Sequence, residues 1–515
     1  MESWDDKRFL IEFEPVRSIG VDSLVAIWSE PHFEAFHPLH LMAYWLDVPW
    51  AGPNGPVLHA TNLLLWIGAL LLVRRVLLAW ELSRIAALLA TLAYGLHPVQ
   101  VEAVTWATGR KEIVALALAC TCILLHARAE SSWGRDAWLS RLAFVGAALA
   151  KTTVLPLPAV LLAYDLSLRR RPLKDALLAQ LPTVVIAAGL GWLVVQIWEA
   201  NEMLRPPPEG LGPVALVAAT YTHHLSTALL PLYTSPVYPI HRTLEDFSWL
   251  DVVGPLLVVA ALARGGARTR FTAFAFAVLL APVSNVWPLY FEVQDRYLSL
   301  PLLPLAFGLG ALVDALSDLG EGRFAIRARA SAAVLVGLYA VLTIVYQGAW
   351  SSDRVLWQHA VETHPESFYA WLKVGEIQRN AGELDDALVA FDAAIEREPT
   401  LRLGHAARFQ TLALMDERDA ELSPSRALQL SQRYVQLADD PEQLRTLGGD
   451  LMRAGYRRAV LAVLARSLDL QALEPERLEN AALIQLSQGN EWLVRFYVSR
   501  LGRPPLDPRL QSFAD

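Results

Sequence analysis

The sequence predicts an all-α membrane protein, with a polytopic helix bundle over residues 1–347 and a soluble tetratricopeptide-repeat solenoid over residues 348–515. Two observations support this fold class. The 515 residues are 54% hydrophobic, with long uncharged runs rich in leucine and alanine, as in integral membrane proteins. These runs stop near residue 347, after which charged residues occur at the density of a soluble domain. The formal net charge of -8 argues against nucleic-acid binding, because no basic stripe is available for phosphates.

The apolar runs of the first domain predict its helices. They lie near residues 57–73, 83–96, 111–127, 138–150, 153–166, 177–198, 211–232, 250–264, 270–286, 298–315 and 328–347. Arginine-rich links should be cytoplasmic by the positive-inside rule, and these links are residues 74–75, 126–135, 168–174, 264–270 and 323–329. Strict alternation fails at 211–232, a run with Tyr221, Thr222, His223 and His224 at its centre. We therefore expect a re-entrant or interfacial helix there, which leaves about ten spans.

This topology predicts which segments lie outside the cytoplasm. They are residues 97–110, 150–153, 199–249 and 284–297, together with the soluble tail. The opening segment "ESWDDKRF" is also placed outside, although neither a signal peptide nor an apolar helix precedes it. We expect a helix upstream of Met1 in preference to a segment that folds back without an anchor.

The soluble tail carries a helical-repeat pattern. In residues 369–399, Trp371, Val374 and Gly375 mark one helix, and Gly382 ends it. Ala387, Phe391 and Ala394 follow on the facing side of a second helix, and Pro399 stops it. A half unit precedes this pair at residues 353–365, and a looser copy follows with Leu447, Gly448 and Gly455. The stacked units predict either a concave surface for peptides or partner proteins, or a packing module.

Candidate catalytic groups stand in the outer segments. The adjacent carboxylates of Asp5 and Asp6 can supply a general base, although an acidic pair near a terminus is more often just solvated. His37 and His40 have a spacing that can share a metal ion, but no third ligand stands nearby in sequence, and ordinary packing is the stronger interpretation.

Three cations stand at outer helix ends. Arg110 opens a helix after His97 and Glu102, Lys151 lies between two helices, and Arg296 follows Asp295 at the start of a late span. If these ends meet in space, Arg110, Lys151 and Arg296 form a basic rim near lipid, which suits a phosphate whose tail stays in the bilayer. His97 is as compatible with packing at a helix end as with ligand contact.

The order of the segments supports a resemblance. "WDDKRF", "FHPLHLMAYWLD", "VLHATNLLLW", "LHPVQVEAVTWATGRKEIV", "AKTTVLPLP", "SPVYPIH" and "QDRYLSLPLLPL" are followed by the repeats. This succession resembles the bacterial branch of the transmembrane and tetratricopeptide-repeat-containing O-mannosyltransferase family, in the C-type glycosyltransferase superfamily. The resemblance implies a polyprenyl-phosphate sugar donor, most simply of mannose, and a protein Ser/Thr acceptor. It also implies a bacterial inner membrane, with the active site and the repeats on the periplasmic side.

The resemblance also implies roles for individual residues. It makes Asp5 the catalytic base, Asp6 its neighbour, and Arg110, Lys151 and Arg296 the ligands of the donor phosphate. His37, His97, Glu102 and Asp295 become supporting residues. The chain departs from the family pattern in two places, because no apolar helix precedes the acidic motif and "AKTTV" lacks an acidic residue after the lysine.

The resulting hypothesis is an inverting sugar transfer that needs no nucleotide. The sequence contains no Gly-rich phosphate loop and does not indicate whether a divalent metal is required. One alternative is a non-enzymatic membrane scaffold, in which the repeats recruit partners and the outer charges pair locally. Another alternative is a transporter, which predicts ionisable residues deep within the spans.

Overall fold

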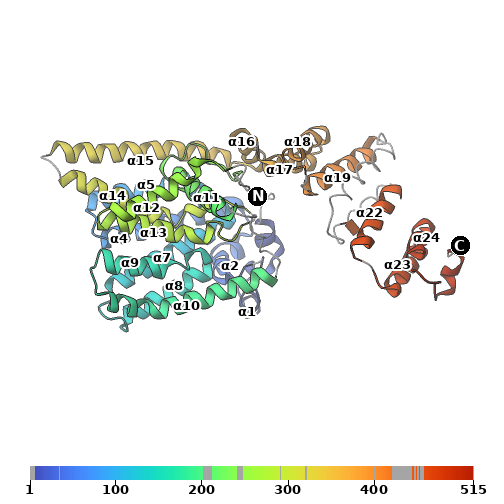
Figure 1. The fold of residues 1–515 in the computed structure, drawn as a ribbon, viewed down its shortest axis with the longest axis horizontal. Helices are drawn as coiled ribbons and strands as arrows, with labels where there is room; N and C mark the ends of the chain where they lie inside the picture. Colours follow the sequence, from blue (N-terminus) through green and yellow to red (C-terminus); the bar gives the residue numbers. More distant parts are fainter. Residues whose placement is uncertain are drawn as a thin grey trace. The chain divides into compact units, whose positions relative to one another are not determined.

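The computed structural model is all-helical over the residues that it describes. These are residues 6–33, 35–200, 212–239, 247–289, 291–318, 322–399, 402–419, 444–445, 448, 452, 457–471 and 473–513. No β-strand occurs among them, and the only β-type pairing there is an isolated bridge between His32 and Ala35. The chain divides into two compact units, Met1–His364 and Pro365–Asp515 (Figure 1). The boundary follows α16 (Asp353–Thr363), a helix that the sequence analysis assigns to the repeats.

The first unit begins with short helices and continues with long ones. The short helices are η1 (Lys7–Glu12), η2 (Glu14–Val16), α1 (Val21–Ser29), α2 (Pro38–Met42), η3 (Ala43–Leu46) and α3 (Val48–Ala51). The next group is α4 (Gly55–Ala79), α5 (Arg84–Gly95), α6 (Gln100–Thr105), η4 (Ala107–Gly109), α7 (Arg110–Arg128), α8 (Arg135–Ala150), η5 (Thr152–Val154), α9 (Leu157–Ser167) and α10 (Leu173–Ala200). The last group before α16 is α11 (Gly212–Leu229), η6 (Trp249–Val252), α12 (Val253–Arg264), α13 (Ala267–Leu280), η7 (Ala281–Val283), η8 (Asp295–Leu298), α14 (Leu302–Asp318) and α15 (Arg323–Ala349). A helix therefore lies at every apolar run that the sequence predicts.

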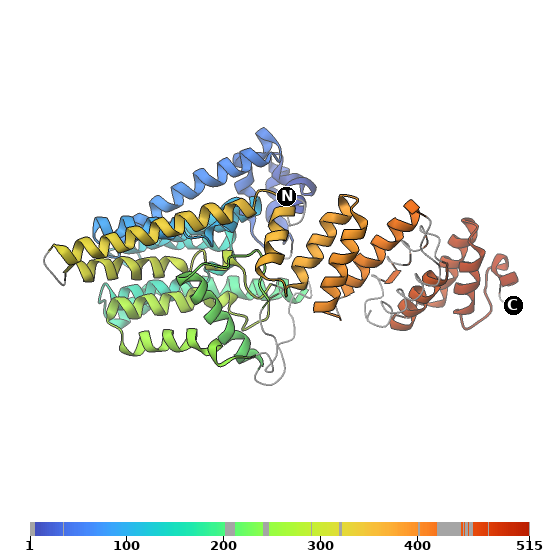
Figure 2. The same cartoon turned by 90° about the horizontal axis from the view of Figure 1, so that it is seen from above.

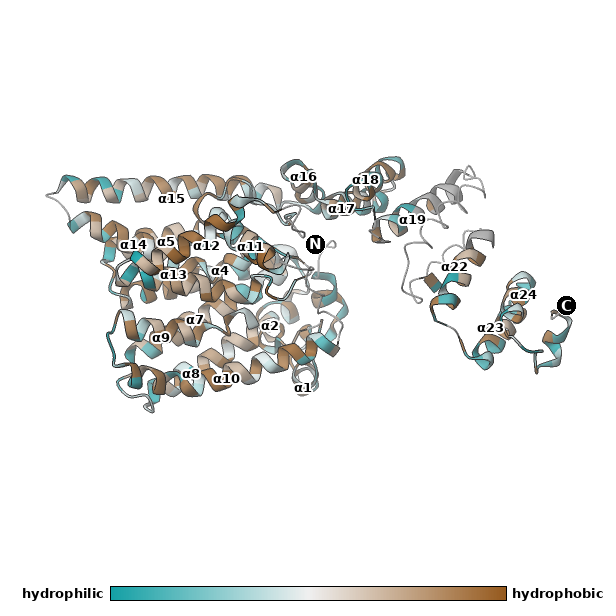
Figure 3. Cartoon of the chain, viewed as in Figure 1, coloured by the Kyte–Doolittle hydropathy of each residue, from teal (hydrophilic) through white to brown (hydrophobic). Residues whose placement is uncertain are grey.

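The long helices of this unit run side by side in both views of the chain (Figures 1 and 2). Their core joins residues of α4, α5, α7, α8, α9, α13 and α14, with many alanines that let the helices approach closely. Phe144, Phe276 and Phe307 fill the larger spaces and are fully buried. Hydrophobic colouring predominates along these helices (Figure 3).

Among the described residues, three helices are long and apolar enough to cross a membrane, namely α4, α10 and α15. The faces of α10 and α15 carry exposed leucine, valine and isoleucine side chains, as expected where lipid replaces water. By contrast, α5 has 12 residues and is about 18 Å long at 1.5 Å per residue, against about 30 Å for a bilayer core. The three long helices are compatible with a membrane protein, while the total of about ten spans stays a prediction.

Alternation of the helices collects their ends into two groups of loops. One group contains the starts of α4, α7 and α14 and the ends of α5, α8 and α15. The predicted outer residues lie in this group. The other group contains the arginine-rich links, where the backbone N–H and hydroxyl of Ser83 donate to Asp314 of α14 at 2.9 and 2.6 Å. Tyr221 and Thr222 of α11 bond to neighbouring helices, since the Tyr221 hydroxyl donates to the Ala277 carbonyl of α13 at 2.7 Å and the Thr222 hydroxyl donates to the Asp251 carbonyl of η6 at 2.5 Å.

The second unit contains α17 (Phe368–Asn380), α18 (Leu384–Arg397), α19 (Arg402–Asp419), α22 (Arg457–Leu470), α23 (Pro475–Ser487), α24 (Glu491–Ser499) and η9 (Pro508–Phe513). The helix pair predicted around Gly375 and Gly382 is confirmed, since α17 ends just before Gly382, whose φ is +80°. Ala387, Phe391 and Ala394 are fully buried in α18. Of the looser repeat, Leu447 and Gly455 lie outside the described residues, so a tetratricopeptide solenoid stays a prediction.

Candidate functional site

The predicted acidic motif meets the loop that precedes α7. Asp6 is buried, and its Oδ1 accepts hydrogen bonds from the backbone N–H of Thr108 at 3.0 Å and from the Thr108 hydroxyl. Phe9 and Leu10 of η1 hold this segment in place, because they pack in a small core with Tyr44 and Ala107. Asp5 lies outside the described residues. The structure therefore brings one carboxylate of the motif to the predicted outer segment of residues 97–110.

The Thr108 loop is unusually tight. A Cβ at Gly109 would stand 2.4 Å from the carbonyl oxygen of Ala103, so only glycine lets the chain pass this backbone. Thr108 is fully buried and was not among the residues predicted from the sequence. A threonine beside a glycine gives no signal of its role until its distant carboxylate partner is known.

Arg110 does not join the predicted basic rim. Its side chain is fully buried, and its Nη1 and Nη2 form a two-point ion pair with Asp47 at 2.8 and 2.5 Å. Its Nε donates to Asn62 at 2.7 Å, and the carbonyls of Ala43 and Leu58 accept further hydrogen bonds. Partners within the fold therefore occupy the donors of the guanidinium, and the predicted role of Arg110 as a phosphate ligand stays a prediction.

The neighbouring Lys111 lies in a different environment from Arg110. It lines a cavity of about 110 Å³ whose other walls come from residues 8–41. Those walls are Arg8, Phe9, His32, Phe33, Ala35, His37, His40 and Leu41. Successive residues of a helix point about 100° apart, so Arg110 faces the core while Lys111 faces the cavity.

His37 lies between this cavity and Lys151. Burial, with Lys111 and then Lys151 nearby, lowers the pKa of His37 to about 3, so the imidazole is neutral at ordinary pH. The neutral ring accepts a hydrogen bond at its Nε2 from the backbone N–H of Thr152 at 3.3 Å. The predicted supporting residue His37 thus joins the α8–α9 link to the cavity wall. Burial also keeps the pKa of His40 well below its ordinary value.

Lys151 and Arg296 come together, each with a carboxylate partner. Lys151 forms an ion pair with Glu112, and Arg296 forms one with Glu102, whose second oxygen accepts from the Arg296 backbone N–H at 2.9 Å. The Lys151 Nζ and Arg296 Cζ stand 5.9 and 5.6 Å from the centre of the Tyr297 ring. Burial lowers the pKa of Lys151, and Glu112 opposes this effect.

Trp106 connects these cations to the cavity. The Nζ of Lys111 lies 5.0 Å from its ring, and the Cζ of Arg296 lies 4.8 Å from it. Lys111, Lys151 and Arg296 therefore surround two aromatic rings, Trp106 and Tyr297. We refer to Lys111, Lys151, Arg296, Glu102 and Glu112 as the outer charge cluster.

Asp295 lies next to this cluster and is also buried. Its Oδ1 accepts from the Tyr238 hydroxyl at 2.6 Å, and that hydroxyl accepts from the backbone N–H of Ser235 at 2.8 Å. Burial, with Glu102 nearby, raises the pKa of Asp295 well above its ordinary value. The Tyr238 ring contacts His223 and His364, with centroids 4.5 and 5.0 Å apart. Asp295 thus anchors the 234–239 loop, and Tyr238 was not predicted.

His97 is a packing residue. Its Nε2 donates to the Ala228 carbonyl of α11 at 3.1 Å, and its Nδ1 accepts from the backbone N–H of Val99 at 3.4 Å. Its ring meets Tyr339 of α15 edge to face, with centroids 4.6 Å apart. Both ring nitrogens are used within the fold, which favours the packing interpretation of His97, while its supporting role near the ligand stays a prediction.

The arrangement can bind an anion and hold a carboxylate nearby, because cations and neutral imidazoles line the cavity beside the Asp6 segment. Within the described parts of the chain, no group of three or more His, Cys, Asp or Glu side chains is placed to hold a metal ion. No protein-family model matches the chain, and a search of curated proteins finds no significant relative.

Proposed function

We propose that this chain is a membrane glycosyltransferase that moves a sugar, in the first instance mannose, from a polyprenyl-phosphate donor to a hydroxyl acceptor. One observation carries the proposal. Segments that are far apart in sequence meet at one end of apolar helices, where the buried Asp6 bonds to Thr108 of the link that precedes Lys111. Lys111 and Arg296 share the Trp106 ring, and Lys151 and Arg296 share the Tyr297 ring. A cationic cavity at the ends of lipid-facing helices suits a phosphate whose chain remains in the bilayer.

The proposed step is an inverting displacement at the anomeric carbon. The acceptor oxygen forms a bond to this carbon while its proton passes to a carboxylate of the Asp5–Asp6 pair. The bond from the carbon to the phosphate oxygen breaks, and the electron pair leaves with polyprenyl phosphate. The leaving phosphate gains one negative charge, which nearby fixed cations stabilise.

The structure changes which cation is assigned to this task. Lys111 replaces Arg110 as the proposed phosphate contact, because Lys111 lines the cavity and Arg110 is occupied by Asp47. Lys151 and Arg296 remain in the proposal as part of the outer charge cluster. The helical repeats present a protein Ser/Thr acceptor in this proposal, and the site faces the extracytoplasmic side.

The experiment is a transfer assay with purified full-length protein in lipid nanodiscs. Polyprenyl-phosphate mannose is the donor, and a Ser/Thr-rich peptide is the acceptor. Asp5→Asn and Asp6→Asn should each lower the rate by about 10²–10⁴-fold if a general base is removed. The control is Glu12→Gln, an exposed carboxylate of the same segment. Wild-type rates in both aspartate variants would remove the acid–base assignment.

A non-enzymatic scaffold is the second candidate, and one specific observation favours it. Arg110, Lys151 and Arg296 each have a carboxylate partner, as residues with a purely structural task would. The scaffold predicts no transfer from any polyprenyl-phosphate sugar, together with proteins from the same cell that co-purify through residues 365–515. Transfer that depends on Asp6 and Lys111 would exclude it.

A further inference from the structure

A second polar site lies at the opposite, arginine-rich ends of the helices, where α7 and α8 are joined. Trp133 and Trp138 are 62% and 51% exposed, although they are large apolar side chains. The guanidinium carbon of Arg141 lies 5.1 and 4.6 Å from the centres of their rings. Arg141 itself is only 4% exposed, so the two rings cover a buried cation.

Arg141 is a buried cation of a different kind from Arg110. Its Nη2 donates to the carbonyls of Ser132 at 2.6 Å and Ala179 at 3.4 Å. Its Nη1 is buried without a hydrogen-bond partner, and no carboxylate pairs with Arg141 among the residues that the structure describes. A charge removed from water without a counter-charge is costly, so this guanidinium is poised for an anion.

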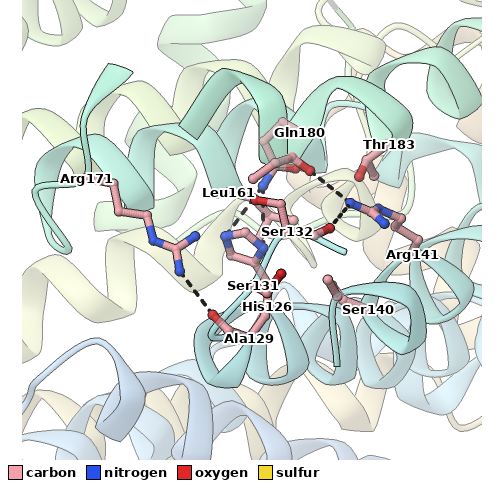
Figure 4. Close-up of a pocket in the computed structure, with 12 residues that line it drawn as sticks. His126, Ala129, Ser131, Ser132, Ser140, Arg141, Leu161, Arg171, Gln180 and Thr183 are labelled. Carbon is pink, nitrogen blue, oxygen red and sulfur yellow. Dashed lines mark hydrogen bonds between the residues drawn. The ribbon is translucent and has the colours of Figure 1, made fainter. Parts of the chain in front are cut away.

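The guanidinium faces a small cavity between α7, α8, α9 and α10 (Figure 4). Hydroxyl groups of Ser131, Ser140 and Thr183 are on its lining, and Arg171 lies across it from Arg141, beyond His126. Its volume of about 10 Å³ has room for one water-sized group. That is the size of one phosphate oxygen, with the rest of the phosphate outside the mouth.

We propose that this cavity binds a phosphate oxygen of an anionic phospholipid headgroup, through the Nη1 of Arg141. Trp133 and Trp138 are exposed near the ends of apolar helices, a position in which aromatic side chains of membrane proteins meet lipid headgroups. The exposed Arg128 and Arg170 add positive charge at the same helix ends, which favours anionic lipid. Free phosphate shares the oxyanion chemistry but gains nothing from the tryptophans. This site is independent of the sugar-transfer proposal, because its residues lie at the other ends of the helices.

The test uses full-length protein and two sources of phosphate. Native mass spectrometry counts the lipids retained after release from nanodiscs of phosphatidylcholine mixed with phosphatidylglycerol. Wild-type protein should retain one more phosphatidylglycerol molecule than Arg141→Gln, whereas Arg135→Gln, an exposed arginine of the same segment, should behave as wild type. Thermal unfolding in pure phosphatidylcholine with added inorganic phosphate forms the second arm.

The outcomes separate the possibilities. Equal phosphatidylglycerol retention by wild type and Arg141→Gln overturns the proposal and leaves the cavity as a site for one water between Arg141 and the unpaired Oε1 of Gln180. Stabilisation of the wild type by inorganic phosphate alone, with no preference for phosphatidylglycerol, overturns the lipid source. If Arg141→Gln does not fold, Arg141→Lys and Trp138→Leu replace it. The lysine variant should keep the retained lipid, and the leucine variant should hold it at least tenfold more weakly.

Discussion

The buried pair of Arg110 and Asp47 gives the sharpest test of whether Arg110 has a structural role in place of the predicted contact with the donor phosphate. Replacing Asp47 by asparagine keeps the shape of the side chain but removes its charge. Asparagine offers one acceptor oxygen where Asp47 accepts from both Nη1 and Nη2. The guanidinium is 0% exposed, so its charge would remain in the core without a counter-charge.

The expected loss of stability is about 3–5 kcal/mol, because breaking a buried pair strands one ion. The measurement is equilibrium unfolding of full-length protein in detergent micelles, at constant detergent and salt. Glu14→Gln is the matched control, since its ion pair with Arg17 is exposed and should contribute less than about 1 kcal/mol. The double replacement Asp47→Leu with Arg110→Met should cost less than the sum of the two single changes.

Two results would refute this reasoning. One is an Asp47→Asn variant as stable as Glu14→Gln, which would mean that the pair does not carry a buried charge. The other is an Arg110→Met variant that keeps full stability and loses sugar transfer, which would return Arg110 to the phosphate site.

Three further predictions concern other parts of the chain. Lys111→Gln should lower transfer from polyprenyl-phosphate mannose by about 10²–10³-fold, mainly in kcat, because Lys111 stabilises charge on the leaving phosphate; a change in KM alone would assign it to donor binding. Burial lowers the pKa of His97 from 6.5 to about 4, so the folded chain binds fewer protons than the unfolded chain. Stability, complete above about pH 6.5, should therefore fall towards pH 4 by up to about 1.4 kcal/mol per pH unit, and His97→Asn should flatten this acid limb in pH-dependent unfolding. A Cβ at Gly375 would stand 2.5 Å from the buried Phe391 ring, so Gly375→Ala should destabilise the second unit by about 1–3 kcal/mol. The loss of stability should be measurable as faster proteolysis after residue 364. Gly348→Ala is the control, because the space around Gly348 is open, and it should not have this effect.

The sequence predicts the helices well, because long apolar runs leave few alternatives for the backbone. The positions of α4, α7 and α10 follow directly from the runs at 57–73, 111–127 and 177–198. The grouping of helix ends was also predictable, since alternation of the spans, with the 211–232 run not counted as a span, places Glu102, Lys151 and Arg296 at the same ends. What the sequence could not supply is the direction of each side chain around its helix.

Arg110 and Lys111 show this limit most clearly. Both are cations in the first turn of one helix, and only the positions of Asp47 and Asn62 decide which of them faces the core. Those two partners come from separate segments and carry no signal of their own. Glu112 lies in the quoted motif "LHPVQVEAVTWATGRKEIV", just beyond the predicted outer segment 97–110. Its pairing with Lys151 depends on how α7 packs on α8.

The ion pair of Glu102 and Arg296 also has a consequence for the time course of synthesis. The two residues are 194 positions apart, so Glu102 leaves the ribosome long before its cation exists. At about 5–20 residues per second, the interval is about 10–40 s. During that time the Glu102 carboxylate must stay hydrated at the membrane surface or form a transient ion pair with a cation such as Lys111. The Glu102→Gln side chain carries no charge that needs hydration during this interval. The variant should therefore shorten the delay before the nascent chain becomes protease-resistant, even if the finished protein is less stable.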